Sequence, residues 1–470
     1  MPEALEREDV QGLVVRGYGR LPFARYVVGE IVDGAAARSW LGSLAGEVAH
    51  GGEQDADAAV QVAFTAAGLR ALGLPAEWLA GFSEQFLEGM LTAHRRRVLG
   101  DREDNAPEHW DWGGPQSAPI HVLLLVYAAG ETTLAALLRR HEERLRAGGI
   151  RLLRAMETAP LDEREHFGFR DGISQPRLAG IGTASAADTV KTGEIVLGYR
   201  NAYRRFTPRP RVPATADPSG VLAADVERPD LRDLGRNGTY LVFRQLEQDV
   251  EAFWRYSADR ARRADGTVDE AARARFEAKV VGRWHSGAPL ALAPDADRPE
   301  LGTANDFGYH HADAHGLRCP LGAHVRRANP RDSLDPAPGT RRSIAVNNRH
   351  RLLRRGRKYG PPASRDIDPG TPAAQAWSDE SRGLHFICLV ANIARQFEFL
   401  QHTWISNPHF NGLYDEPDPL LAAGSHPFSI PAEPVRERYT ALPQFVSVRG
   451  GAYFFLPGIR ALRFLATLPR

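Results

Sequence analysis

A buried strand that runs directly into an amphipathic helix recurs along this chain, and this repeat most constrains the fold. Residues 120–129 (IHVLLLVYAA) are almost entirely apolar, and residues 131–147 follow with apolar side chains at helical spacing. The same pairing recurs twice in the second half, at 239–246 with 249–262 and at 385–391 with 393–404. Because such units occur in both halves, the sequence predicts two related α+β modules.

Further elements and the module boundaries follow from apolar runs and from proline. We expect strands at 10–15 and 445–455, and helices at 36–49 and 78–94. Proline-rich segments between the halves indicate a linker. The sequence predicts an N-terminal module at 1–205, a linker at 206–236 and a C-terminal module at 237–470. A long irregular insertion at 286–382 interrupts the C-terminal module.

Composition and charge exclude several classes of protein. The 470 residues include 59 basic and 58 acidic side chains, and this balance argues against a sequence-blind nucleic-acid binder. Two cysteines, Cys319 and Cys388, are too few for a disulfide scaffold. The apolar run at 120–130 is far shorter than the ~20 residues of a membrane span, and residues 1–9 do not resemble a signal peptide. We therefore expect a soluble cytoplasmic protein.

Common cofactor motifs give no positive indication. The chain has no GxxxxGK[ST], GxGxxG or HExxH pattern. Residues 306–308 (DFG) lack the glycine-rich and catalytic loops of a kinase. Residues 310–315 (HHADAH) gather imidazoles and a carboxylate as a metal site does, but polar surface loops have the same composition.

Three segments carry residues suited to chemistry, and each has an ordinary structural alternative. Residues 166–176 (HFGFRDGISQP) place Asp171 in a turn beside apolar residues, where a carboxyl group can move protons. Residues 318–332 (RCPLGAHVRRANPRD) place His324 on an apolar step followed by arginines, where an imidazole can bind a metal and arginines can neutralise the carboxylates of an anionic cofactor. Residues 351–360 (RLLRRGRKYG) are very basic. The alternatives are an Asp-Gly turn, a structural histidine and a basic surface turn.

Together, the three segments resemble the dye-decolorizing peroxidases, a family of haem enzymes. The GxxDG signature of that family matches residues 168–172, its CPxxAHxRxxNPR segment matches 319–331, and its distal-arginine segment matches 354–360. Blocks at 63–74, 86–90 and 99–101 also fall where the family carries similar ones, so the resemblance covers nearly the whole chain. It is closest to the larger bacterial and fungal branches.

The resemblance implies an α+β fold of two ferredoxin-like modules, with one haem b per chain in the C-terminal module. It assigns His324 as the axial iron ligand and Asp171 as the group that moves a proton during cleavage of hydrogen peroxide. It also assigns Arg354 as the cation beside the departing oxygen. An acidic pH optimum is expected.

Other site residues follow from the same resemblance. Arg327 and Arg331 are expected to contact the haem propionates, and the backbone of Gly172, Ile173 and Ser174 to approach the haem edge. The axial histidine of such sites usually donates its second N–H to a carboxylate. Where relatives often have aspartate this chain has Asn392. Either Glu398 supplies the carboxylate instead, or the histidine is less imidazolate-like and the reduction potential of the iron is higher.

The expected partners are hydrogen peroxide and one-electron donors such as dyes and phenols. We expect the protein to bind neither nucleic acid nor a membrane, and it could form a homo-oligomer. Because a buried haem edge excludes bulky dyes, surface aromatics are candidates for their oxidation, namely Trp254, Trp284, Trp377, Trp404, Tyr359 and Tyr414. The alternative function is a haem-binding or haem-handling protein with little turnover.

Overall fold

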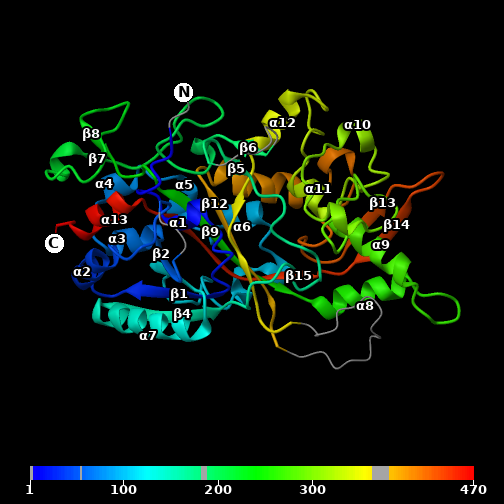
Figure 1. Cartoon of the computed structure of the whole chain (residues 1–470), viewed down its shortest axis with the longest axis horizontal. Coiled ribbons are helices and arrows are strands. Elements are labelled where there is room, and N and C mark those ends of the chain that lie inside the picture. Colours follow the sequence, from blue (N-terminus) through cyan, green and yellow to red (C-terminus); the bar gives the residue numbers. More distant parts are fainter. Residues whose placement is uncertain (1–3, 53–55, 182–187, 363–379, 470) are drawn as a thin grey trace.

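One antiparallel sheet of nine strands runs through both halves of the molecule (Figure 1). The computed structural model describes residues 4–52, 56–181, 188–362 and 380–469. Eight strands follow the order β10-β12-β9-β15-β2-β3-β1-β4, and β11 also pairs with β12. In the part of the chain so described, no helix is long and apolar enough to cross a bilayer.

The N-terminal part of this sheet has the ferredoxin-like order β4-β1-β3-β2. All seven residues of β3 are buried, as their apolar run predicts. The helix α7 occupies the span predicted for it and covers the sheet together with α2 (Figure 1). The elements in chain order are β1 (Phe23–Ile31), α2 (Gly34–Leu44), β2 (Ala58–Phe64), β3 (Val122–Ala128), α7 (Glu131–Ala147) and β4 (Ile150–Glu157).

The C-terminal part repeats that order as β15-β9-β12-β10, which confirms the prediction of two ferredoxin-like modules. Two turns of π-helix stand where the helix at 393–404 was expected. The elements are β9 (Thr239–Gln248), α8 (Val250–Arg260), α9 (Glu270–Val281), β10 (Leu353–Arg354), β11 (Arg357–Tyr359), β12 (Gly383–Val390), the π-helical Ala394–Glu398 and Leu400–Ile405, β15 (Val446–Leu456) and α13 (Ile459–Ala466).

The remaining helices and strands of the described chain are short. The helices are α1 (Gly12–Val15), α3 (Ala66–Ala71), α4 (Ala76–Leu79), α5 (Glu84–Glu88), α6 (Ala93–Leu99), α10 (His310–Asp313), α11 (His324–Ala328) and α12 (Arg341–Asn348). Single 3-10 turns lie at Glu103–Asn105, Pro107–His109, Thr192–Glu194, Ala214–Ala216, Pro299–Leu301 and Phe410–Gly412. The strands are β5 (Arg177–Leu178), β6 (Thr189–Val190), β7 (Arg211–Pro213), β8 (Leu231–Asp233), β13 (His426–Ile430) and β14 (Glu437–Leu442).

Other predicted segments also differ from the structure; the helix expected at 36–49, for example, is α2 and ends at Leu44. The expected strand at 10–15 is the short helix α1. The single helix expected at 78–94 is interrupted, because Gly89 adopts a φ of 72° and Ser83 and Thr92 each accept a hydrogen bond that starts a new helix. The proline-rich linker contains the antiparallel pair β7 and β8.

The two modules meet where β15 lies beside β2, through the single pair Phe455 and Phe64. The following helix, α13, packs on α2 of the N-terminal module (Figure 1). A continuous apolar core joins the two modules on this side of the sheet, and Phe64, Phe455 and Leu462 all belong to it. The sheet therefore forms one scaffold for the irregular segments between α9 and β12.

Candidate functional site

His324 opens the helix α11, and a buried carboxylate fixes its ring. The His324 Nδ1 atom lies 3.0 Å from Asp418 Oδ2, and the Asp418 side chain is fully buried. The other carboxylate oxygen of Asp418 accepts hydrogen bonds from the backbone N–H groups of Leu420 and Leu421. The Asp418 carboxylate is therefore held in place, and it orients the imidazole.

The electrostatics of this pair favour an ordered, electron-rich imidazole. Burial lowers the pKa of His324, but the charge and hydrogen bond of Asp418 outweigh it and the net pKa is raised. Burial raises the pKa of Asp418, whereas His324 and Arg327 lower it, with a lowered net value. The His324 side chain is 27% exposed, and its Nε2 has no hydrogen bond to any residue that the structure describes. That nitrogen is available to a metal ion.

A second buried ion pair supports the helix that carries His324. Arg326 has no exposed side-chain surface, and its guanidinium lies 2.9 Å from Asp313 Oδ2. The same guanidinium donates to the carbonyl of Cys319, while Asp313 accepts from the backbone N–H groups of Arg318 and Cys319. This network joins α10, the Cys-Pro segment and α11.

Asp171 is the last residue of a tight hairpin formed by residues 163–171. The backbone N–H of Asp171 donates to the carbonyl of Glu163, and Arg164 pairs with Arg170 across the hairpin. Gly168, with a φ of 97°, forms the turn. The Asp171 side chain is 52% exposed. This acid therefore lies at an accessible surface of the site.

Arg354 lies directly beside Asp171. Its Nη1 atom is 3.2 Å from Asp171 Oδ1, and its backbone N–H donates to the side chain of Gln175. Arg354 belongs to β10, which pairs with β12 on the outer side of the sheet. The charges of Arg354 and Asp171 both act on the pKa of His324, so the three residues lie in one neighbourhood, and their shared role stays a prediction.

Arginines are concentrated around this site beyond what its carboxylates balance. Burial lowers the pKa of Arg283 and of Arg351 to about 10, and the charges of Arg331 and Arg354 also lower both. Among the residues that the structure describes, Arg351 pairs with Asp188 and Arg354 with Asp171, whereas Arg283 and Arg331 have no carboxylate partner. This excess of positive charge fits a ligand with two carboxylates.

Arg327 is engaged differently from our expectation. It is fully buried, and its guanidinium donates to the backbone carbonyls of Trp404, Asn407 and Glu416. These bonds occupy it inside the protein, so the prediction that it contacts a propionate is wrong. Arg331 donates to the backbone and side chain of Asn305, and its contact with a propionate stays a prediction.

The expectation that Asn392 or Glu398 contacts His324 is also wrong. Glu398 accepts hydrogen bonds from Tyr453 and Arg95. The Asn392 side chain accepts from the backbone N–H of Arg395 at the start of its own helical segment. Both side chains form their hydrogen bonds with other residues, and Asp418 is the carboxylate beside His324.

The turn after Asp171 contributes to the same neighbourhood. Ser174 donates its hydroxyl hydrogen to Asn305 and accepts a hydrogen bond from Arg351 at its carbonyl. Gly172 adopts a φ of 80°. Close approach of Gly172, Ile173 and Ser174 to a cofactor edge stays a prediction.

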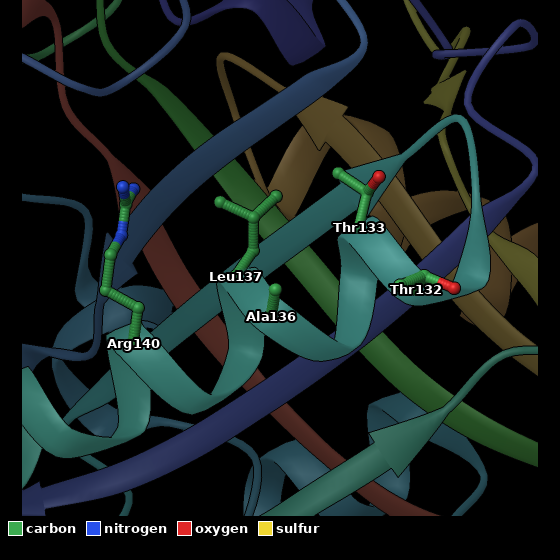
Figure 2. Close-up of a pocket in the computed structure, with 5 residues that line it drawn as sticks. All are labelled: Thr132, Thr133, Ala136, Leu137 and Arg140. Carbon is green, nitrogen blue, oxygen red and sulfur yellow. The ribbon is translucent and has the colours of Figure 1, made fainter.

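Other candidates lie outside this arrangement. No group of three metal-ligating side chains occurs in the described ranges, and Asp313 of the HHADAH run belongs to the Arg326 network. Figure 2 shows a groove on the outer helix α7, with Arg140 as its one charged lining residue beside Thr132, Thr133, Ala136 and Leu137. Nothing in that lining suits redox chemistry.

The aromatic candidates for surface oxidation are mostly buried. Trp254, Trp284, Trp404 and Tyr359 all lie in the interior, which rules out direct contact with a bulky dye. Tyr414 is 77% exposed. Trp377 lies outside the described residues.

Comparison with known proteins gives a consistent result. No protein-family model matches the chain. A dye-decolorizing peroxidase of Mycena epipterygia is 30% identical over 450 residues, which cover 87% of this chain and 76% of that protein. A dye-decolorizing peroxidase of Exidia glandulosa is 33% identical over 315 residues, which cover 63% of this chain. The match spans 55% of that protein, about half of its length.

Solved structures agree with these relatives. An ancestral D-type dye-decolorizing peroxidase superimposes with a TM-score of 0.77 at 28% identity, over 98% of this chain and 99% of that one. A dye-decolorizing peroxidase in complex with 2,6-dimethoxyphenol gives a TM-score of 0.77 at 26% identity, over 98% of this chain and all of that one. The chain belongs to the dye-decolorizing peroxidase family.

Proposed function

We propose that the chain is a haem peroxidase that uses hydrogen peroxide to oxidise dyes, phenols and other one-electron donors. The observation that carries this proposal is the convergence of His324, Asp171 and Arg354 on one site, with Asp418 behind the histidine. Family membership supports the class of reaction. The complex of a relative with 2,6-dimethoxyphenol supports phenols as donors.

The residues present fit one haem b. His324 Nε2 would bind its iron, because Nδ1 is already hydrogen-bonded to Asp418. Its propionates would lie in the positive field of Arg283, Arg331 and Arg351, with Arg331 as the proposed contact. When bound, haem supplies the redox centre that accepts two oxidising equivalents from peroxide and returns them to donors one at a time.

The side chains of this chain supply the proton chemistry. The Asp171 carboxylate accepts a proton from hydrogen peroxide and returns it to the departing oxygen, so that water leaves rather than hydroxide. Arg354 stabilises the negative charge that develops on that oxygen, and its bond to Asp171 holds the carboxylate toward it. Half of the Asp171 side chain is exposed, so peroxide can reach it.

A haem-binding protein with little turnover is the weaker alternative. Binding alone requires neither an accessible carboxylate nor an arginine paired with it, and this site has both. The test compares wild type with Asp171→Asn and Arg354→Leu in the peroxide-driven oxidation of an anthraquinone dye and of 2,6-dimethoxyphenol. Rates in both variants equal to wild type at equal haem content would refute the roles assigned to these residues.

Module boundaries at 1–205, 206–236 and 237–470 and a cytoplasmic location belong to the same proposal. Both cysteines are free buried thiols, as expected in a reducing compartment. Fractionation of the source cells tests the location, and recovery outside the cytoplasm would overturn it.

A further inference from the structure

A single carboxylate organises the hairpin that precedes Asp171. Glu165 Oε2 accepts a hydrogen bond of 2.8 Å from the backbone N–H of Phe167, and Oε1 accepts one of 2.8 Å from that of Phe169. The side-chain amide of Gln248, on β9, donates a third bond of 2.7 Å to Oε2. The Glu165 backbone adds two more bonds, to Phe169 and Gly168. The turn is thus wrapped around this side chain.

Only an ionised carboxylate satisfies these three donors at once. A glutamine would offer one acceptor oxygen and would direct an N–H₂ group at a backbone N–H. The rings of Phe167 and Phe169, on either side of Gly168, pack against Phe253 of α8. The turn is therefore fixed on one side by apolar packing and on the other by the Glu165 charge.

The geometry of this turn passes directly to Asp171. Arg164 and Arg170 pair across the hairpin, and the next bond along it is from the Asp171 backbone N–H to Glu163. A shift of the Glu165 turn would displace the Asp171 carboxylate relative to Arg354, 3.2 Å away. We propose that Glu165 is a positioning residue for Asp171. This inference rests on the proposed function, in which Asp171 moves the proton.

Charge acts in the same direction as geometry. Burial raises the pKa of Glu165, its three hydrogen bonds lower it, and the charge of Asp171 raises it, with a raised net value. The neighbouring Arg164 donates a hydrogen bond to the carbonyl of Gly168, and the ring of His166 is hydrogen-bonded to the carbonyl of Tyr359. Glu165 and Asp171 are therefore close enough to interact as like charges.

The test compares Glu165→Gln with Glu163→Gln in the haem-loaded protein. Glu163 pairs with Arg170 and is 75% exposed, so its replacement removes the same charge from the same hairpin at a solvated position. We expect Glu165→Gln to lower kcat/KM for hydrogen peroxide about 10- to 100-fold, as a displaced catalytic group does. KM for the phenol should be unchanged, and the pH profile of kcat/KM should differ from that of wild type. Glu163→Gln should stay within twofold of wild type.

A double variant separates positioning from general damage. If Glu165 acts through Asp171, then Glu165→Gln adds no further loss in the background of Asp171→Asn. Losses that multiply, or a wild-type kcat/KM and pH profile in Glu165→Gln, would overturn the inference. Should Glu165→Gln fail to retain haem, Glu165→Asp carries the same test, because it keeps the charge but is too short to reach both N–H groups. An undiminished rate in Asp171→Asn alone would instead refute the proposed function.

Discussion

Replacement of Asp313 by asparagine tests how the helix that carries His324 is held. The Asp313 and Arg326 side chains are at most 1% exposed, and Asp313 also accepts the backbone N–H groups of Arg318 and Cys319. Loss of one partner of a buried ion pair costs about 3–5 kcal/mol, because the other charge remains buried without compensation. Arg326 keeps two carbonyl acceptors, from Cys319 and Asp313, so we expect the lower end, about 3 kcal/mol.

Urea unfolding of the haem-loaded protein measures this loss, with far-UV circular dichroism and haem absorbance followed together. The midpoint should fall by this loss divided by the measured slope of the free energy of unfolding against urea concentration. The matched variants are Arg326→Met and the double variant Asp313→Asn/Arg326→Met. The double variant should lose less than the sum of the two single variants, since it buries no unpaired charge.

Two results would refute this reasoning. An unchanged midpoint in Asp313→Asn would mean that the ion pair contributes no stability. Additive losses in the double variant would mean that Asp313 and Arg326 act independently, despite their 2.9 Å contact.

Three further outcomes follow from the structure. His324→Ala should abolish the haem absorbance of a histidine-ligated protein, and added imidazole should restore it; absorbance like wild type without imidazole would remove His324 as the ligand. Asp418→Asn should weaken haem binding about 10- to 100-fold and raise the reduction potential, because it replaces the hydrogen-bond partner of the ligand. The control Glu398→Gln should leave the potential unchanged. Equal shifts of the potential in both variants would contradict the geometry. Burial lowers the pKa of His385 to about 4, below its unfolded value of about 6.5, so its contribution to stability is full above pH 6.5 and is lost as pH falls toward 4. His385→Gln should therefore reduce the loss of stability between pH 7 and pH 4.5 by about 2–3 kcal/mol, measured from denaturation midpoints at both values.

The sequence predicted well where local pattern and tertiary structure agree. Residues 131–147 form α7 with the predicted bounds, since amphipathic spacing and burial against the sheet coincide. Residues 120–129 contain β3 for the same reason. The segment at 78–94 failed because the N-caps at Ser83 and Thr92 restart the helix, and helical spacing alone does not show such caps.

The site was predicted as far as its motifs extend. Asp171, His324 and Arg354 lie in local motifs; Arg354 contacts Asp171, and the charges of both act on His324, while the roles assigned to the three stay predictions. Asp418 was missed because it is 94 residues from His324 in a segment with no motif, and only the fold brings the two together. Arg327 misled because an arginine beside a histidine ligand looks like an anion contact, whereas tertiary packing directs it to backbone carbonyls.

The same limit explains the HHADAH run. Its composition suggested either a metal site or a polar surface loop, and neither describes Asp313, which pairs with a buried arginine thirteen residues later. A buried guanidinium finds either a carboxylate, as Arg326 does, or backbone carbonyls, as Arg327 does, and a sequence with 59 basic and 58 acidic side chains offers too many combinations to choose between them.

The position of β15 has a consequence for synthesis of the chain. This strand lies between β9 and β2, so it completes both modules and joins them, yet it spans residues 446–456. Until the ribosome has released it, β2 and β9 each present an unpaired edge, and such edges template intermolecular pairing. From the synthesis of β9 (239–248) until that of β15 (446–456), the nascent protein therefore carries two aggregation-prone edges, and the same strand then pairs along β9 and meets β2 at Phe64.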